Sequence, residues 1–249
     1  MKKLIKIYGE RNTSTNYLSQ LIKLNLQATE VSGVAPKHIL KVQKIVPGNE
    51  LIRDIYFYLT YRKNLGWKHS CVKPNKIQKK YKQADSQLSF ITITKNPYSW
   101  LLSLHRKPYH HSLTKKQSFK QFLQHPWKTV RRDNLKSNLK NPIELWNLKN
   151  RSYLQIDNTV ALHLLSENII EQPDIIINKI STHFSIERSS DTFINYNKST
   201  KDMKKDSDYY RNYYRNKKWR DEISSEEIAI INETLDFKLM SRYGYDVIT

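Results

Sequence analysis

A chain of 249 residues whose apolar residues fall in periodic segments can bury a core, so we expect one folded domain, residues 1–249, and not a disordered protein. Its single cysteine excludes an internal disulfide, and no apolar run approaches the roughly 20 residues of a membrane span, which together favour a soluble cytoplasmic protein. The net charge of +20 predicts a positive surface, but charge alone leaves nucleic acid, phosphorylated cofactors, acidic glycans and anionic lipid open as partners.

Strand and helix patterns alternate along the chain. Short apolar or β-branched runs are each followed by apolar residues at helical spacing. The predicted pairs, strand first, are 4–8 with the helix after Ser14, 88–94 with 98–106, and 159–164 with a helical stretch that ends at Phe184. Strands that alternate with helices predict a parallel sheet covered on both faces, which is a three-layer α/β fold.

The segments between these units predict further helices and one long loop. A short amphipathic helix is expected over 115–124, and Pro142 starts another over 141–157. The stretch 189–208 is polar without a hydrophobic period, which indicates a long loop or lid. Ser224 and Glu227 form a capping box that opens a last helix, and Gly244 stands where that helix should stop.

The turn after the first predicted strand is a candidate anion site. It reads GERNTSTN from Gly9 to Asn16, and it lies at the carboxyl end of a strand and the start of a helix. Unpaired N–H groups and the helix dipole favour an anion there, and short hydroxyl and amide side chains add donors. The turn lacks the Gly-Lys-Ser/Thr ending of a Walker A loop, which disfavours a Mg²⁺-dependent nucleotide hydrolase. An ordinary polar capping turn is the alternative.

This turn resembles the 5′-phosphosulfate loop of sulfotransferases, a family with a P-loop-like fold that uses 3′-phosphoadenosine 5′-phosphosulfate (PAPS) as donor. Arg11 stands in the place of the basic residue on the bridging phosphate, Ser14 and Thr15 match the hydroxyl pair, and Tyr17 matches an aromatic residue. Thr13 replaces the usual glycine, and a β-branched residue tolerates positive φ badly. The resemblance implies that the donor contacts Arg11, Asn12, Thr13, Ser14, Thr15, Asn16 and Tyr17.

A second match follows the predicted strand 88–94. The segment KNPYSWLLS, from Lys95 to Ser103, resembles the family's 3′-phosphate element, in which a basic residue precedes Asn-Pro and a serine lies on the helix. Lys95 at the strand end and Ser103 on the helix can converge on one phosphate. Lysine lacks the bidentate fork of arginine, so we expect weaker donor binding than an arginine would provide.

The segment GWKHS lies between these two elements. Lys68 and His69 resemble a lysine and a histidine that serve transfer in the family, the lysine toward the leaving phosphate and the histidine as base, although here the two are adjacent. A lone histidine is otherwise a structural or exposed residue. His110 and His111 are competing candidates for the base.

A softer match near the end of the chain covers Lys217, Lys218, Trp219 and Arg220. These residues resemble a basic and aromatic stretch that closes over the nucleotide, and a solvated amphipathic helix is the alternative. The family's Arg-Tyr-Glu-Asp-Leu segment is reduced here to residues 165–169, so its adenine contact is not transferred.

The resemblance implies a metal-independent enzyme that transfers a sulfuryl group to a hydroxyl or amine, and a basic cleft fits a glycan acceptor. The histidines lack tight ligand spacing and a cysteine partner, so we expect no metal site. Two other functions stay open. One is a nucleic-acid-binding protein that uses the basic surface, and the other is a nucleotide kinase of related fold.

Overall fold

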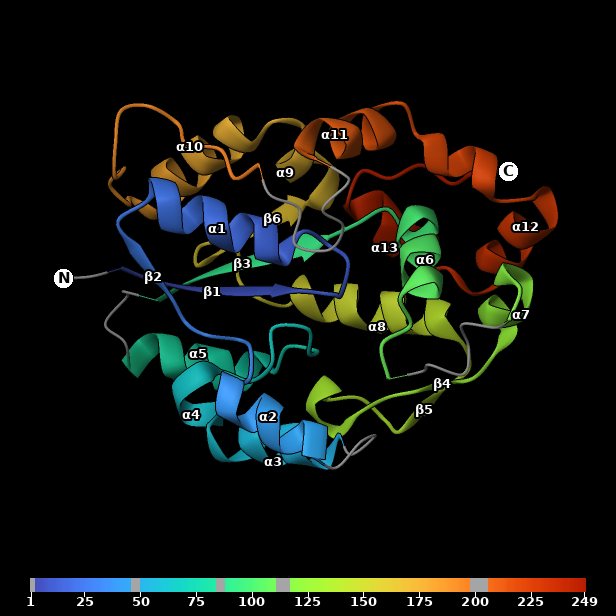
Figure 1. Ribbon diagram of the computed structural model, residues 1–249, viewed down its shortest axis with the longest axis horizontal. Helices are drawn as coiled ribbons and strands as arrows, with labels where there is room; N and C mark the ends of the chain where they lie inside the picture. Colours follow the sequence, from blue (N-terminus) through green and yellow to red (C-terminus); the bar gives the residue numbers. More distant parts are fainter. Residues whose placement is uncertain (1–2, 46–49, 84–87, 111–116, 198–205) are drawn as a thin grey trace.

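A parallel β-sheet lies at the centre of the computed structural model, which describes residues 3–45, 50–83, 88–110, 117–197 and 206–249 (Figure 1). The sheet has four strands in the order β2-β1-β3-β6, and every neighbouring pair is parallel. The strands are β1 (Lys3–Gly9), β2 (Ala28–Glu30), β3 (Leu88–Thr94) and β6 (Ala161–Leu165). The three strands predicted from the sequence are confirmed.

Helices cover both faces of this sheet (Figure 1). On one face, Ile5 and Ile7 of β1 pack against α1 (Thr15–Asn25), α9 (Ser166–Glu171) and α10 (Pro173–Phe184). On the other face, Tyr8 and Phe90 pack with α5 (Pro74–Gln83) and with the end of α8 (Pro142–Tyr153). Apolar side chains project from both faces of the sheet and pack against helices on each side. The predicted three-layer α/β fold is therefore confirmed.

A second core of helices extends beyond the carboxyl ends of the strands. It joins α8 to α6 (Pro97–Arg106), α7 (Phe119–Gln124), α12 (Ser225–Thr234) and α13 (Phe237–Arg242). A short antiparallel pair, β4 (Trp127–Lys128) and β5 (Asn138–Leu139), borders it. Asn96 caps α6 by accepting from the N–H groups of Tyr98 and Ser99, so the predicted Asn-Pro start of this helix is confirmed.

Several helix boundaries differ from the prediction. The expected stretch up to Phe184 is divided at Gln172, because Pro173 begins a new helix and cannot donate a backbone hydrogen bond. The last helix is divided at Asp236, which caps α13 by accepting from the N–H of Leu239. The helix begun by Pro142 ends at Tyr153.

The region between β2 and β3 is helical, although no helix was predicted there. It holds α2 (Lys37–Ile45), α3 (Leu51–Leu59), α4 (Tyr61–Asn64) and α5. Lysines interrupt the apolar period of these segments. In the polar stretch predicted as a loop or lid, residues 189–197 contain no helix, and 198–205 lie outside the described residues. None of the described helices is both long and apolar enough to cross a membrane.

Candidate active site

The turn after β1 packs tightly around Gly9. A Cβ atom on Gly9 would lie 2.9 Å from both Thr13 Oγ1 and Thr15 Cγ2, so only glycine fits there. Asn12 and Ser14 adopt the left-handed backbone conformation, with φ of 65° and 60°, whereas Thr13 does not. Thr13 instead donates its hydroxyl to the carbonyl of Glu10 at 2.5 Å. The expected conflict between positive φ and a β-branched residue at position 13 therefore does not arise.

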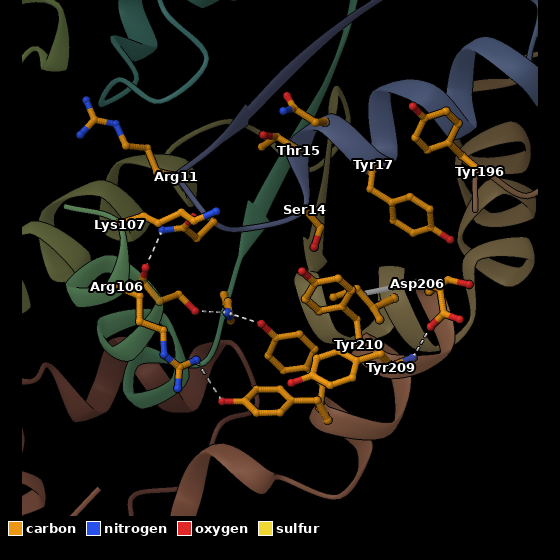
Figure 2. A pocket seen from close by; sticks show the side chains of 18 of the residues that line it. Arg11, Ser14, Thr15, Tyr17, Arg106, Lys107, Tyr196, Asp206, Tyr209 and Tyr210 are labelled. Atoms are coloured by element: carbon orange, nitrogen blue, oxygen red, sulfur yellow. Dashed lines mark hydrogen bonds between the residues drawn. The ribbon is translucent and has the colours of Figure 1, made fainter. Parts of the chain in front are cut away.

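The N-terminus of α1 opens into a cavity of about 330 Å³ (Figure 2). Both predicted anion-binding elements reach this cavity, together with His69 and six further tyrosines. The first element contributes Arg11, Asn12, Ser14, Thr15, Asn16 and Tyr17, and the second contributes Lys95 and Ser103. Other parts of the chain contribute, among others, Arg106, Lys107, Tyr109, Tyr196, Asp206, Tyr209, Tyr210, Tyr213 and Tyr214. Thr13 and Lys68 are not among the lining residues.

Lys95 and Ser103 meet in this cavity. The ammonium of Lys95 donates to Ser103 Oγ at 2.8 Å and to the hydroxyl oxygen of Tyr214 at 2.7 Å. Lys95 is almost fully buried, and burial lowers its pKa to about 7, although Glu167 opposes the shift. The side-chain amide of Asn12 donates to the carbonyl of Ser103 at 3.1 Å, so the two predicted anion-binding elements touch directly.

Tyr214 belongs to α11 (Ser207–Arg215), a helix whose site role the sequence did not reveal. Burial raises the pKa of Tyr214 to about 12, so its hydroxyl keeps its proton at neutral pH. That oxygen accepts from Lys95, and a side-chain hydrogen bond also links Tyr214 to Ser103. Lys95, Ser103 and Tyr214 thus form a cluster of one amine, which is charged below its pKa of about 7, and two hydroxyl groups.

His69 borders the cavity beside the end of β1. Its Nδ1 lies 2.6 Å from the carbonyl oxygen of Gly9, and its ring meets the ring of Trp67 edge-on at 5.0 Å. Burial, aided by the charges of Lys68 and Arg11, lowers the pKa of His69 well below its usual range. The imidazole is therefore neutral at pH 7. Because a carbonyl can only accept, Nδ1 carries the hydrogen and Nε2 keeps its lone pair.

The competing histidines are placed differently. His110 Nε2 lies 2.8 Å from the carbonyl of Lys128, and its Nδ1 lies 3.3 Å from Arg11 Nη1. This arrangement occupies both ring nitrogens, and His110 does not line the cavity. His111 lies outside the described residues. Of these three candidate histidines, His69 is the one that the described residues place on the cavity wall.

Lys68 points toward the start of α1. Its ammonium donates to Asn16 Oδ1 at 2.5 Å, and Asn16 lines the cavity. Burial lowers the pKa of Lys68, and Glu30 opposes the shift. Lys68 therefore places positive charge beside the α1 N-terminus, behind the lining residues.

The guanidinium of Arg11 extends away from Ser14 (Figure 2). It lies 4.7 Å from the ring centre of Trp67 and 4.4 Å from that of Tyr109. Cation–π contacts with two rings hold it at the cavity wall near His69. The geometry does not favour the expected contact between this guanidinium and a bridging phosphate at the α1 N-terminus.

The basic and aromatic stretch near the end of the chain does not reach the cavity. Lys217 and Lys218 are exposed and do not line it. Trp219 is 4% exposed and stacks on Tyr98 in the helical core, with ring centres 6.2 Å apart. After α11, Lys217 adopts a left-handed backbone conformation with φ 47° and begins the short 3-10 helix Lys218–Glu222, which contains Trp219. The cavity is lined instead by tyrosines of α11, namely Tyr209, Tyr210, Tyr213 and Tyr214.

Buried lysines hold the segment that carries Lys68 and His69. Lys6, in the middle of β1, donates to the carbonyls of Asn64 at 2.5 Å and Gly66 at 2.8 Å. The N–H of Gly9 donates to the carbonyl of Lys68 at 2.9 Å. The sequence does not reveal that Lys6 anchors this segment, because a single lysine in an apolar strand is typical of an edge strand or an exposed position.

Lys149 of α8 connects three parts of the site. Its ammonium donates to Asp133 Oδ1 at 2.6 Å and to the carbonyl of His69, and it forms an ion pair with Glu10 Oε2 at 3.0 Å. Burial lowers the pKa of Lys149, but Asp133 and Glu10 more than offset this, so the pKa lies above its usual value. Lys149 therefore stays charged and fixes the His69 segment against the turn after β1.

Comparisons with known proteins give only distant similarities. No family model matches the chain, and no curated protein matches its sequence. Among solved structures, the chain is similar to the sulfotransferase domain from the Synechococcus PCC 7002 olefin synthase, with 14% identity, a TM-score of 0.47, and coverage of 100% of this chain and 96% of that one. A sulfotransferase from Alicyclobacillus acidocaldarius matches with 13% identity, a TM-score of 0.47, and coverage of 99% and 97%. A sulfotransferase domain from the curacin biosynthetic pathway has 10% identity and a TM-score of 0.42, with coverage of 100% and 99%.

Proposed function

We propose that the protein is a sulfotransferase that moves a sulfuryl group from PAPS to a hydroxyl or amine of an acceptor, with a glycan as the first candidate. One observation carries the proposal. Two separate anion-binding elements, the turn before α1 and the Lys95–Ser103 pair, open onto the same cavity of about 330 Å³, which also contains the neutral His69. A nucleotide with phosphates at both its 3′ and 5′ positions needs two such elements at once.

The residues around the cavity fit this donor. Lys95, Ser103 and Tyr214 supply a cation and two hydroxyls for the 3′-phosphate, and ATP has no phosphate at that position. The N-terminus of α1 and the turn before it suit the 5′-phosphosulfate. Tyrosines on α11 offer aromatic faces on which a purine can stack. The donor supplies an electrophilic sulfur attached to a phosphate leaving group.

The protein's own contribution is mainly positioning and electrostatics. His69 Nε2 takes the proton of the acceptor hydroxyl or amine as the new bond to sulfur forms. Lys68 and the N–H groups at the start of α1 stabilise the charge that develops on the leaving phosphate. Arg11, held between the rings of Trp67 and Tyr109, adds positive charge that acts on His69 at the cavity wall.

A ligand-dependent shift of the melting temperature tests the proposal. We expect adenosine 3′,5′-bisphosphate to raise the melting temperature much more than ATP or adenosine 5′-phosphosulfate at equal concentration, because only the bisphosphate fills both anion-binding elements. A free bisphosphate concentration of about 100 times Kd corresponds to roughly 2.7 kcal/mol of stabilisation of the folded protein. Equal shifts with all three nucleotides, combined with salt-dependent binding to a DNA oligonucleotide, would instead support the nucleic-acid-binding alternative.

Binding of the bisphosphate should depend on pH through Lys95. In the free protein its pKa is about 7, and a bound phosphate favours the charged form and raises that pKa. Above pH 7 binding must therefore take up a proton, and we expect affinity to fall by up to about tenfold per pH unit toward pH ~9. Isothermal titration calorimetry in buffers of different ionisation enthalpy measures this uptake. Lys95→Arg, which stays charged, should remove the dependence; a wild-type affinity that is constant over this range would contradict the role of Lys95.

A further inference from the structure

The helices α2 and α3 expose an apolar and basic surface far from the sheet. Figure 1 shows them with α4 on the opposite side of the molecule from α1 and α10. On α3 the solvent-facing side chains are apolar, with Leu51 44% exposed, Ile55 48%, Tyr58 83% and Leu59 73%. Side chains so exposed along one face of a helix are unusual on a soluble domain and mark an interaction surface.

The same surface includes a shallow apolar groove of about 280 Å³ between α2 and α3. Its lining residues are Ile39, Ile52, Ile55, Tyr56, Leu59 and Thr60. Helix α2 has no buried residue, and its apolar side chains Leu40, Val42 and Ile45 are each more than one-third exposed. The apolar surface therefore spans both helices.

The charges around this apolar surface have one sign. Between residues 36 and 64 the only carboxylates are Glu50 and Asp54, and both face inward, where they form ion pairs with Arg132. The exposed cations of this stretch are Lys37, Lys41, Lys44, Arg62 and Lys63. An apolar helix face flanked by lysines and arginines, without exposed carboxylates, matches the surface of a lipid bilayer with anionic headgroups.

We propose that the α2–α3 surface docks on an anionic lipid bilayer, with the apolar side chains of α3 at the acyl boundary and the lysines of α2 at the headgroups. Asp54 on the inner side of α3 accepts from Arg132 at 2.8 Å, and the Arg132 guanidinium stacks on Trp67, 4.6 Å from its ring centre. The docking helix is thus tied to the segment that carries His69. The inference does not depend on the proposed function.

Co-sedimentation of the full chain with large unilamellar vesicles tests the inference. We expect binding to phosphatidylcholine vesicles that contain about one-third phosphatidylglycerol, weaker binding at high salt, and little binding to pure phosphatidylcholine. The double variant Ile55→Glu/Leu59→Glu should lower the partition coefficient at least ~10-fold, because it places two carboxylates at the acyl boundary. Both positions are exposed, so far-ultraviolet circular dichroism should show an unchanged fold.

Matched controls separate this surface from the general positive charge. Ile175→Glu alters an isoleucine that is 51% exposed on α10, and it should leave vesicle binding unchanged. The triple variant Lys37→Gln/Lys41→Gln/Lys44→Gln should lose binding at least ~10-fold. Lys23→Gln/Lys140→Gln/Lys238→Gln removes the same charge elsewhere and should bind nearly as well as wild type.

Two results would overturn the inference. Equal loss of binding in both lysine variants would show that vesicles attract the whole basic molecule and not this surface. A dimer in light scattering that Leu59→Glu dissociates, together with no binding to anionic vesicles, would assign the surface to contact between two copies of the chain.

Discussion

Replacement of His69 by alanine is expected to slow sulfuryl transfer about 100-fold or more while leaving the Kd for adenosine 3′,5′-bisphosphate nearly unchanged. The imidazole lines the cavity, its Nδ1 is engaged by the carbonyl of Gly9, and its pKa lies well below the usual range. The alanine variant keeps the anion-binding elements but loses the only proton acceptor that we assign. Single-turnover kinetics with PAPS and calorimetry with the bisphosphate measure the two quantities separately.

The pH profile adds an independent readout for His69. A base stays competent only while it is unprotonated, so the lowered pKa predicts no fall in rate as pH decreases from 8 to about 6. His110→Ala is the matched control, because the ring nitrogens of His110 already face Lys128 and Arg11. If His110→Ala abolishes transfer and His69→Ala does not, the assignment of the base is wrong.

Replacement of Lys149 by methionine is expected to lower the free energy of unfolding by about 3–5 kcal/mol. Methionine fills similar space, but it leaves the carboxylates of Asp133 and Glu10 buried without their cation, and it frees the carbonyl of His69. Equilibrium unfolding in urea, followed by tryptophan fluorescence, measures the loss.

A variant that removes every charge of the cluster is the control for Lys149→Met. Lys149→Met/Glu10→Gln/Asp133→Asn removes the cation and both carboxylates, and it should recover much of the lost stability, because a buried ion cluster replaced as a whole leaves no unpaired charge. Burial raises the pKa of Asp133, but Lys149 and Arg11 lower it more, so its pKa lies below the usual value and the stabilising contribution of Asp133 is lost as pH falls below about 4. A single variant as stable as wild type at neutral pH would show that the cluster does not stabilise the fold.

Local sequence patterns determined the strand and helix units that build the sheet. The period of the apolar residues predicted β1, β3 and β6, and the Asn96-Pro97 pair marked the start of α6, because periodicity and helix caps act over a few residues. The same patterns identified the turn before α1 and the Lys95–Ser103 segment as candidate anion sites. Parallel strands place their carboxyl ends at one edge of the sheet, so the two segments were expected to lie close together. The catalytic roles of their residues stay predictions.

Contacts between residues far apart in the sequence determined the other features of the site and its support. Only the fold shows that Tyr214 joins Lys95 and Ser103, that Trp219 belongs to the core, and that the guanidinium of Arg11 lies between aromatic rings. The sequence by itself could not separate Lys149 from a surface lysine, because a lysine on a helix has the same local pattern in both cases. Whether it meets buried carboxylates or water depends on residues far away in the chain, and those contacts form only when the helices and the sheet pack together.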